Sequence, residues 1–130
     1  MSVNYLPNLD PELHEGTYVF VIVPLTEDVS GLDVIATMRE EEGMTLVLSE
    51  SIAEQRGYES IYRCAWITLR VNSDLDAVGL TAAFARSLAD ESIACNVIAG
   101  ARHDHLFVPV DRAVDALGCL QQLQRRSAEG

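Results

Sequence analysis

Residues 61–110 decide the fold of this chain: IYRCAWITLRVNSDLDAVGLTAAFARSLADESIACNVIAGARHDHLFVPV. The first eleven of them place apolar side chains at every second position, which is the period of a half-buried β-strand. Those alternate positions are Ala65, Ile67, Leu69 and Val71. The next apolar side chains recur at spacings of three and four, which predicts an amphipathic helix over residues 76–91. They are Leu80, Ala83, Phe84 and Leu88.

Two more apolar runs and a second helix complete this half of the chain. Residues 93–100 and HLFVPV at residues 105–110 are short and rich in β-branched side chains, so both are predicted strands. Asp111 is the expected N-cap of the last helix. The apolar face of that helix consists of Ala113, Ala116, Leu117 and Leu120. This order of elements is that of a ferredoxin-like α+β unit, an antiparallel sheet with helices on one face.

A unit with this order borrows one further strand from elsewhere in the chain. YVFVIV, residues 18–23, is a short β-branched run that ends at Pro24, and it is the expected donor of that strand. Residues 34–40 and 43–49 are predicted as two strands joined by an acidic corner.

A short helix follows these strands. Ser51 and Glu54 have the spacing of a capping box, and Gly57 is the expected C-terminal stop. When the two halves are offset by 61 residues, both run strand, strand, helix, and their terminal glycines coincide. We therefore expect two modules, residues 1–60 and residues 61–130, that share or exchange strands, the first module lacking one helix.

The composition excludes several functions. The chain has 130 residues, 48% of them hydrophobic, and a formal net charge of -11. All its basic residues are arginines, so it has neither a Schiff-base lysine nor the lysine of a phosphate-binding P-loop. No basic patch suits a nucleic acid, and no apolar run reaches the roughly 18 residues of a membrane span. The N-terminus lacks the pattern of a signal peptide, so the expected location is the cytoplasm.

The long motif LDAVGLTAAFARSLADESIACNVIAGARHDHLFVPV, residues 75–110, resembles the C-terminal module of small bacterial ACT-domain proteins. IATMREEEGMTLVLSE, in the first half, resembles the ACT-like module that precedes it. The resemblance covers most of residues 17–122. It implies a tandem ACT fold, a regulatory role in sensing an amino acid, no catalytic residue, no cofactor, and self-association as a homodimer. The chain departs from the family pattern at Ala101 and Arg102, where aromatic residues are common.

Ligands of ACT modules commonly bind at an interface, between the loop that opens the first helix and the strand beside it. The residues that the resemblance places there are Asp76, Val78, Gly79, Leu80, Cys95, Asn96, Val97, Ile98 and Asp104. A loop glycine lets the backbone approach a ligand, and amides near a helix N-terminus attract a carboxylate. The main chain of the facing strand could bind the ligand as an added strand does. Asp104 is the expected counter-charge for an ammonium group, and residues 40–42, three glutamates, occupy the equivalent corner of the first half.

Several of these residues also have a purely structural interpretation. Gly79 could equally relieve crowding where helices pack. Asn96 is also explained as a buried amide that a neighbouring loop satisfies. The three glutamates of residues 40–42 are also explained as a solvated hairpin tip. An assembly module without a ligand, which pairs through sheet edges or helices, is a second functional class that the sequence leaves open.

A metal-dependent enzyme is the third class. His103 and His105 are two residues apart, so on a strand both project to one face and form a pair of candidate zinc ligands. A site needs a third donor, and strand alternation directs Asp104 to the other face. The cysteines lie in apolar segments without metal-binding spacing, which predicts buried, reduced thiols of raised pKa. They are Cys64, Cys95 and Cys119.

Overall fold

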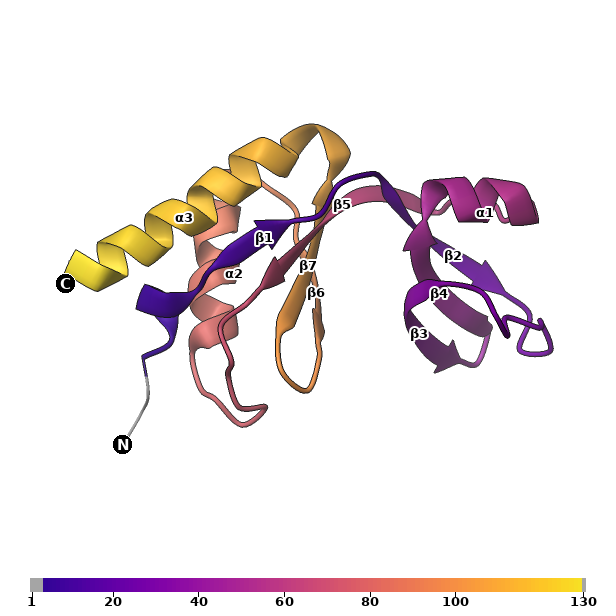
Figure 1. The fold of residues 1–130 in the computed structure, drawn as a ribbon, viewed down its shortest axis with the longest axis horizontal. Coiled ribbons are helices and arrows are strands. Elements are labelled where there is room, and N and C mark those ends of the chain that lie inside the picture. Colours follow the sequence, from indigo (N-terminus) through magenta and orange to yellow (C-terminus); the bar gives the residue numbers. More distant parts are fainter. Residues whose placement is uncertain (1–3, 130) are drawn as a thin grey trace. The chain divides into compact units, whose positions relative to one another are not determined.

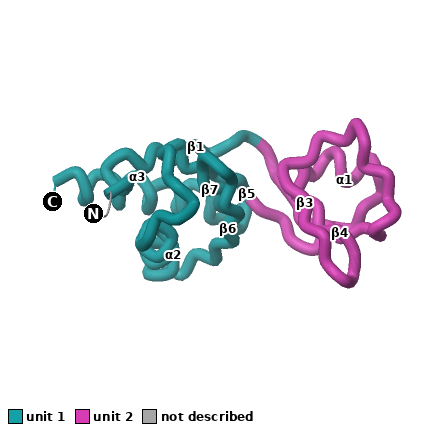
Figure 2. Tube along the Cα trace, turned by 90° about the horizontal axis from the view of Figure 1, so that it is seen from below, with its two compact units in different colours: residues 1–15, 65–130 teal, residues 16–64 magenta. Residues whose placement is uncertain are grey.

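The computed structural model describes residues 4–129, and the chain folds into two compact units (Figure 2). Unit 1 combines residues 1–15 with residues 65–130, and unit 2 consists of residues 16–64. The N-terminal segment packs into unit 1 rather than with the residues that follow it, and the expected division into modules of residues 1–60 and 61–130 stays a prediction.

Unit 2 is a set of antiparallel strands with one helix. Its elements are β2 (Tyr18–Val23), β3 (Val34–Glu40), β4 (Gly43–Ser49), α1 (Glu50–Arg56) and the first residues of β5 (Tyr62–Leu69). The strand order is β3-β4-β2-β5. Alternate residues of β2 are buried against those of β4, which gives the core of this unit. That core contains Val19, Val21, Val23, Leu46, Leu48 and Ala53.

The start of α1 differs from the prediction. Its N-cap is Ser49, whose hydroxyl oxygen accepts a hydrogen bond from the backbone N–H of Ile52 at 3.3 Å. The predicted capping box at Ser51 is wrong, because Ser51 already lies inside the first turn. Gly57 ends the helix as predicted, in the left-handed conformation with φ 72°.

Unit 1 contains two helices that pack together on one face of its strands (Figure 1). Its elements are η1 (Leu6–Asn8), β1 (Pro11–Leu13), the later residues of β5, α2 (Leu80–Asp90), β6 (Asn96–Ala99), β7 (Asp104–Pro109), η2 (Val110–Arg112) and α3 (Ala113–Glu129). Side chains of the strands and of both helices share one core. They include Ala65, Ile67, Leu69, Leu106 and Val108 from the strands and Phe84, Leu88, Ala116 and Leu120 from the helices.

The strand that completes unit 1 is β1, not the predicted donor β2. β1 pairs antiparallel with β5, with Pro11 opposite Leu69 and Leu13 opposite Ile67. β2 instead pairs with the first residues of β5, with Tyr18 opposite Cys64. β5 thus serves both units, so the predicted ferredoxin-like α+β class with shared strands is confirmed. The fourth strand of unit 1 comes from a segment that the sequence pattern did not mark as regular.

The N-terminal segment belongs to unit 1 for a packing reason as well. Leu9 is fully buried in the core of unit 1, and its backbone carbonyl accepts a hydrogen bond from the N–H of Val71. Burying a leucine side chain stabilises a fold by about 1.5–3 kcal/mol. Leu9 therefore holds this segment on unit 1 independently of the pairing of β1.

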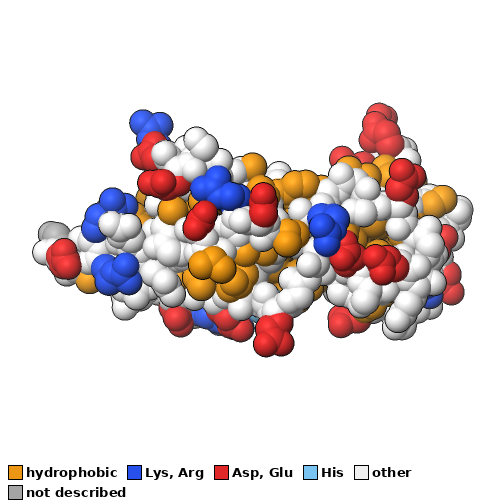
Figure 3. Space-filling model, turned by 90° about the horizontal axis from the view of Figure 1, so that it is seen from above, with side chains coloured by type: hydrophobic (Ala, Val, Ile, Leu, Met, Phe, Trp, Pro, Cys, Tyr) orange, Lys and Arg blue, Asp and Glu red, His pale blue; other side chains and the backbone are white. Residues whose placement is uncertain are grey.

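The last helix also begins differently from the prediction. Residues 110–112 form the 3-10 turn η2, and Pro109 rather than Asp111 stands at its N-cap position, without a side-chain cap. Asp111 lies inside this turn, just before α3, where a negative charge is favoured by the helix dipole. No helix within residues 4–129 is both long and apolar enough to cross a membrane. Several separate groups of acidic side chains lie on the face of unit 2 that Figure 3 shows.

Candidate functional site

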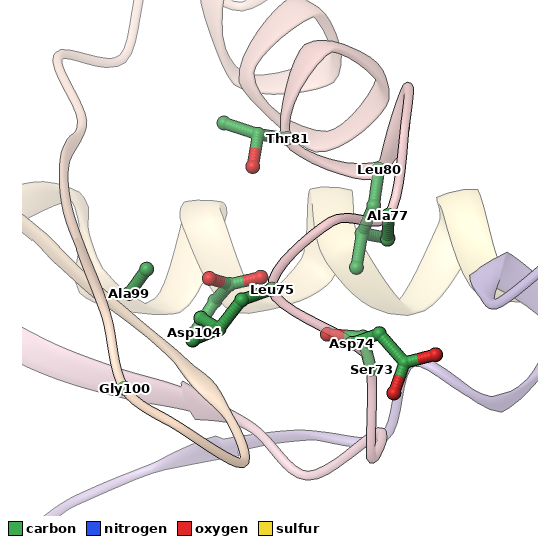
Figure 4. Close-up of a pocket in the computed structure, with 9 residues that line it drawn as sticks. All are labelled: Ser73, Asp74, Leu75, Ala77, Leu80, Thr81, Ala99, Gly100 and Asp104. Atoms are coloured by element: carbon green, nitrogen blue, oxygen red, sulfur yellow. The ribbon is translucent and has the colours of Figure 1, made fainter.

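Unit 1 holds a small pocket between the loop that opens α2 and the hairpin of β6 and β7 (Figure 4). Its volume is about 70 Å³. The residues that line it are Ser73, Asp74, Leu75, Ala77, Leu80, Thr81, Ala99, Gly100 and Asp104. Small side chains form much of the wall, and no arginine or histidine is among the lining residues. The pocket therefore has an acidic character and accommodates a small occupant.

Asp104 is the most unusual residue of the pocket. It occupies the first position of β7, with the same parity as the core residues Leu106 and Val108, so its side chain lies on the face that the helices cover. Only 8% of the residue is exposed. Figure 4 shows its carboxylate directed between Ala99 and the loop that carries Leu75.

The Asp104 carboxylate has no partner in the described part of the chain: neither a hydrogen bond nor a salt bridge reaches it. Burial raises the pKa of Asp104 above its ordinary value, and the nearby His105 opposes this shift only in part. A carboxylate in this position can accept a positive charge from an occupant of the pocket.

Asp74 is the second carboxylate of the pocket, and it behaves differently. Figure 4 shows its carboxylate turned away from that of Asp104, and it accepts a hydrogen bond from the hydroxyl of Tyr5 at 3.4 Å. Asp74 is exposed. It therefore adds negative potential at the rim, whereas Asp104 is the group inside.

The loop places the start of α2 at the pocket. Gly79 is the N-cap residue, in the left-handed conformation with φ 95°, and α2 has no side-chain cap there. The first amides of a helix have no partner within the helix. The backbone N–H groups of the first turn of α2, after Gly79, therefore lie beside the pocket, because Leu80 and Thr81 both line it. A carboxylate or another anionic group is favoured at such an end.

The structure brings some of the predicted site residues to the pocket and leaves others outside. Leu80 and Asp104 line it. Asp76, Val78 and Gly79 lie on the adjoining loop but do not line it, and Val78 is 93% exposed. The predicted strand residues also lie outside the lining; they are Cys95, Asn96, Val97 and Ile98. Whether any of these residues binds a ligand stays a prediction.

Sequence reasoning missed several lining residues. They are Ser73, Asp74, Leu75, Thr81, Ala99 and Gly100. A hairpin register would have identified Ala99, because it stands directly opposite Asp104. Gly100 lies in a tight turn: a Cβ atom there would lie 3.0 Å from the carbonyl oxygen of His103, which leaves little room for a side chain.

The two histidines beside Asp104 have protein partners. His103 Nδ1 lies 3.2 Å from the carbonyl oxygen of Val71, and His105 Nδ1 lies 3.1 Å from the indole nitrogen of Trp66. Within residues 4–129, no group of three or more His, Cys, Asp or Glu side chains is placed to hold a metal ion. Burial raises the pKa of the Cys64 thiol to about 12 and that of Cys95 to about 11, so both are poor nucleophiles at neutral pH.

The equivalent corner of unit 2 is built differently. Gly43 begins β4 with φ 150°, and a Cβ atom at this position would lie 2.6 Å from the carbonyl oxygen of Val23. At the 61-residue offset, Gly43 corresponds to Asp104, so unit 2 has no carboxylate at the corresponding position. Glu41 and Glu42 lie exposed in the turn before Gly43, and Glu40 accepts a hydrogen bond from Thr45.

Comparisons with known proteins agree with this architecture. Two family models, each described as an ACT domain, match in tandem, one over residues 4–65 and the other over residues 61–122. Their overlap falls at the start of β5, the strand that both units use. The solved structure of a protein of unknown function from Vibrio cholerae, described as a possible transport protein, covers 92% of this chain and 93% of its own, with 48% identity and a TM-score of 0.83.

More distant solved structures share the fold alone. A protein from Agrobacterium tumefaciens has 15% identity and a TM-score of 0.69, with 91% of this chain and 90% of that chain covered. The ligand-free regulatory subunit of aspartate kinase from Thermus thermophilus has 11% identity and a TM-score of 0.68, with 87% and 95% covered. No curated protein matches the sequence.

The fold and the pocket together define a regulatory module that binds small molecules, in a class whose domains are not themselves catalytic. The chain belongs to the ACT-domain family and carries two ACT domains in tandem. The resemblance seen in the sequence is thereby confirmed.

Proposed function

We propose that the chain is a non-catalytic sensor that binds a small amino acid in the pocket of unit 1. The observation that carries this proposal is Asp104, a carboxylate that is 8% exposed, without a protein partner, and directed into a pocket. An ammonium group next to Asp104 would supply the missing charge partner. The charge-assisted hydrogen bond between them would be stronger than one between neutral groups.

The opposite end of the ligand would meet the start of α2. The uncapped amides after Gly79 favour a carboxylate, while Asp104 on the hairpin favours an ammonium, so the pocket offers complementary ends for a zwitterion. The volume of about 70 Å³ and the walls of Ala77, Ala99 and Gly100 leave little room for a side chain. We therefore expect glycine, alanine or serine to be favoured over aromatic amino acids.

We also propose that the protein acts in the cytoplasm as a homodimer. Leu75 and Val78 flank the pocket and are 71% and 93% exposed. Apolar side chains exposed to this degree on a ligand loop are typical of a surface that a partner covers. The same exposure favours the second candidate, an assembly module without a ligand. In that case Leu75 and Val78 would contact a partner chain and have no role in ligand binding.

A melting panel separates the two candidates. The full chain is heated with each of the twenty amino acids at millimolar concentration. A ligand present at a hundred times its dissociation constant stabilises the folded state by about 2.7 kcal/mol, which is visible as a higher Tm. Asp104→Asn should abolish the shift, because the amide carries no charge. Asp111→Asn, an exposed carboxylate in η2, should retain it.

The outcomes are distinct. A shift with small amino acids that needs Asp104 supports the sensor. A flat panel, together with a stoichiometric complex that Leu75→Ser and Val78→Ser disrupt, supports the assembly module instead. A shift that persists in Asp104→Asn contradicts the assignment of this pocket.

A further inference from the structure

Four side chains from three strands of unit 1 form a polar cluster on the face of the sheet that the helices do not cover. They are His14, which follows β1, Trp66 and Thr68 on β5, and His105 on β7. On β5, Trp66 and Thr68 alternate with the core residues Ala65, Ile67 and Leu69, and on β7 His105 precedes the core residue Leu106. The cluster therefore lies opposite the side of the sheet that holds Asp104.

The contacts within the cluster are close. His14 stacks on the indole of Trp66 with ring centroids 3.6 Å apart and an angle of 13° between the planes. Thr68 Oγ1 lies 2.7 Å from His14 Nε2 and 3.1 Å from His105 Nδ1. The indole N–H of Trp66 donates to His105 Nδ1 at 3.1 Å. Thr68 is 2% exposed, so these bonds are shielded from water.

This hydrogen-bond pattern requires a neutral His105. The indole N–H only donates, so His105 Nδ1 must carry a lone pair and the ring proton must be on Nε2. A proton added at Nδ1 would face the Trp66 N–H, donor against donor. Thr68 Oγ1 can accept from both rings when both are charged, but the two imidazolium groups would then share one oxygen and repel each other, and the Trp66 N–H would have lost its acceptor.

We propose that this cluster is a proton-sensitive latch that holds β1 against β5 and loosens when His105 and His14 become charged. β1 has only three residues, and its end is fixed by the bond from the N–H of His14 to the carbonyl oxygen of Trp66 at 3.0 Å. β1 is also held by the side chain of Leu13, which packs against the core of unit 1, and by the exposed salt bridge of Glu12 with Arg70, a kind of pair that adds little stability.

The charges around the two imidazoles support the direction of the switch. Burial lowers the pKa of His105, and His103, His14 and Arg70 lower it further, while Asp104 opposes them. Burial also lowers the pKa of His14, with Arg70 acting in the same direction and Glu12 against it. Below the ordinary pKa of 6.5 the unfolded chain thus binds more protons than the folded one. The free energy of unfolding consequently falls as the pH falls through that window.

Release of β1 is local rather than global. Leu9 stays in the core of unit 1, so the segment remains attached while residues 11–14 separate from β5 and Leu13 gives up its contact with the core. The edge of β5 that β1 covers would then expose its backbone groups, which is a site for pairing with another strand. The inference concerns the opposite face from the ligand pocket and does not depend on the proposed ligand.

The chain supplies its own reporter, because Trp66 is the only tryptophan and the three histidines can be replaced one at a time. Trp66 fluorescence is followed between pH 8 and pH 5 at constant salt. We expect a transition with its midpoint below pH 6.5. His105→Gln should remove most of it, since glutamine accepts the indole N–H without titrating, and His14→Gln should reduce it. His103→Gln is the control and should retain the transition, with its midpoint moved to higher pH because one of the groups that lower the pKa of His105 is removed.

A second measurement on the unaltered chain covers the case in which a variant fails to fold. Nitrogen-15 shifts should place the His105 proton on Nε2 at pH 7.5, and the protection factor of the His14 amide against exchange should fall about tenfold more than those of amides in α2 on going to pH 5. A His105 proton on Nδ1, a transition that needs His103 instead, or equal loss of protection throughout unit 1 would each overturn the latch.

Discussion

Asp104 stands directly opposite Ala99 in the antiparallel pair of β6 and β7. The methyl group of Ala99 leaves space for the carboxylate, and the parity of Asp104 with Leu106 points it toward the helices. A core position thus holds an acid that no side chain of residues 4–129 neutralises. Because such a group opposes folding, we interpret it as the functional centre of unit 1.

The same reasoning predicts that Asp104→Asn stabilises the ligand-free protein at pH 7. Burial raises the pKa of Asp104, so the folded state holds its proton to higher pH than the unfolded state does. The free energy of unfolding therefore falls as the pH rises from 3.8 through the folded pKa. Asparagine removes this loss. Urea unfolding at pH 4 and pH 7 should show a gain for the variant at pH 7 only; a loss at pH 7 would contradict the absence of a partner.

Two glycines of unit 1 should respond in opposite directions to alanine. Gly79 has φ 95° with open space around its Cβ position, so Gly79→Ala should destabilise the fold by about 1 kcal/mol through backbone strain alone. Gly118 lies exposed inside α3 with nothing within 4 Å of its Cβ position, so Gly118→Ala should stabilise by about 0.5–1 kcal/mol. The denaturant midpoints of the two variants measure these changes in stability. Changes of the same sign for Gly79→Ala and Gly118→Ala would refute this account of the loop.

Leu9 tests whether the N-terminal segment belongs to the core of unit 1. Leu9→Ala should lower the free energy of unfolding by about 2–5 kcal/mol, because Leu9 is fully buried there. Leu25→Ala, at a position 52% exposed, should change it by less than about 0.5 kcal/mol. Similar small effects for both variants would show that the segment does not contribute to the core.

The two serines at the start of α1 form another matched pair. Ser49→Ala should cost about 1 kcal/mol, since it removes the hydrogen bond to the N–H of Ile52. Ser51→Ala should be close to neutral because Ser51 is an exposed helix residue. Thermal unfolding monitored by circular dichroism measures both variants. The capping box predicted from sequence would require the larger loss of stability at Ser51 rather than at Ser49.

Periodicity was sufficient to predict the ferredoxin-like α+β class. The alternation of apolar residues around Ile67 and their helical spacing around Phe84 depend only on residues near in sequence, and both residues lie in the core of unit 1 as these patterns predict. The strand donor was not local. β1 has three residues that include a proline and a glutamate, so its pairing with β5 depends on tertiary contacts such as the burial of Leu9.

The site was predictable only in part. The resemblance to ACT modules pointed to Asp104, as the counter-charge for an ammonium group, and to Leu80, in the loop that opens the first helix of the module. Ala99 and Gly100 carry no chemical signal and reach the pocket through the hairpin register. The cluster of His14 and His105 could not be foreseen, because it joins strands that are far apart in the sequence and one of them was not recognised.

The most direct test of the proposed sensor is a two-dimensional nitrogen–hydrogen NMR titration of the full chain with glycine, alanine and serine. The account predicts saturable shifts of the amides of residues 77–81 and 99–104, with one ligand bound per chain, and no such shifts in Asp104→Asn. Saturable shifts confined to residues 16–64, or no shifts with any of the three at millimolar concentration, would contradict it.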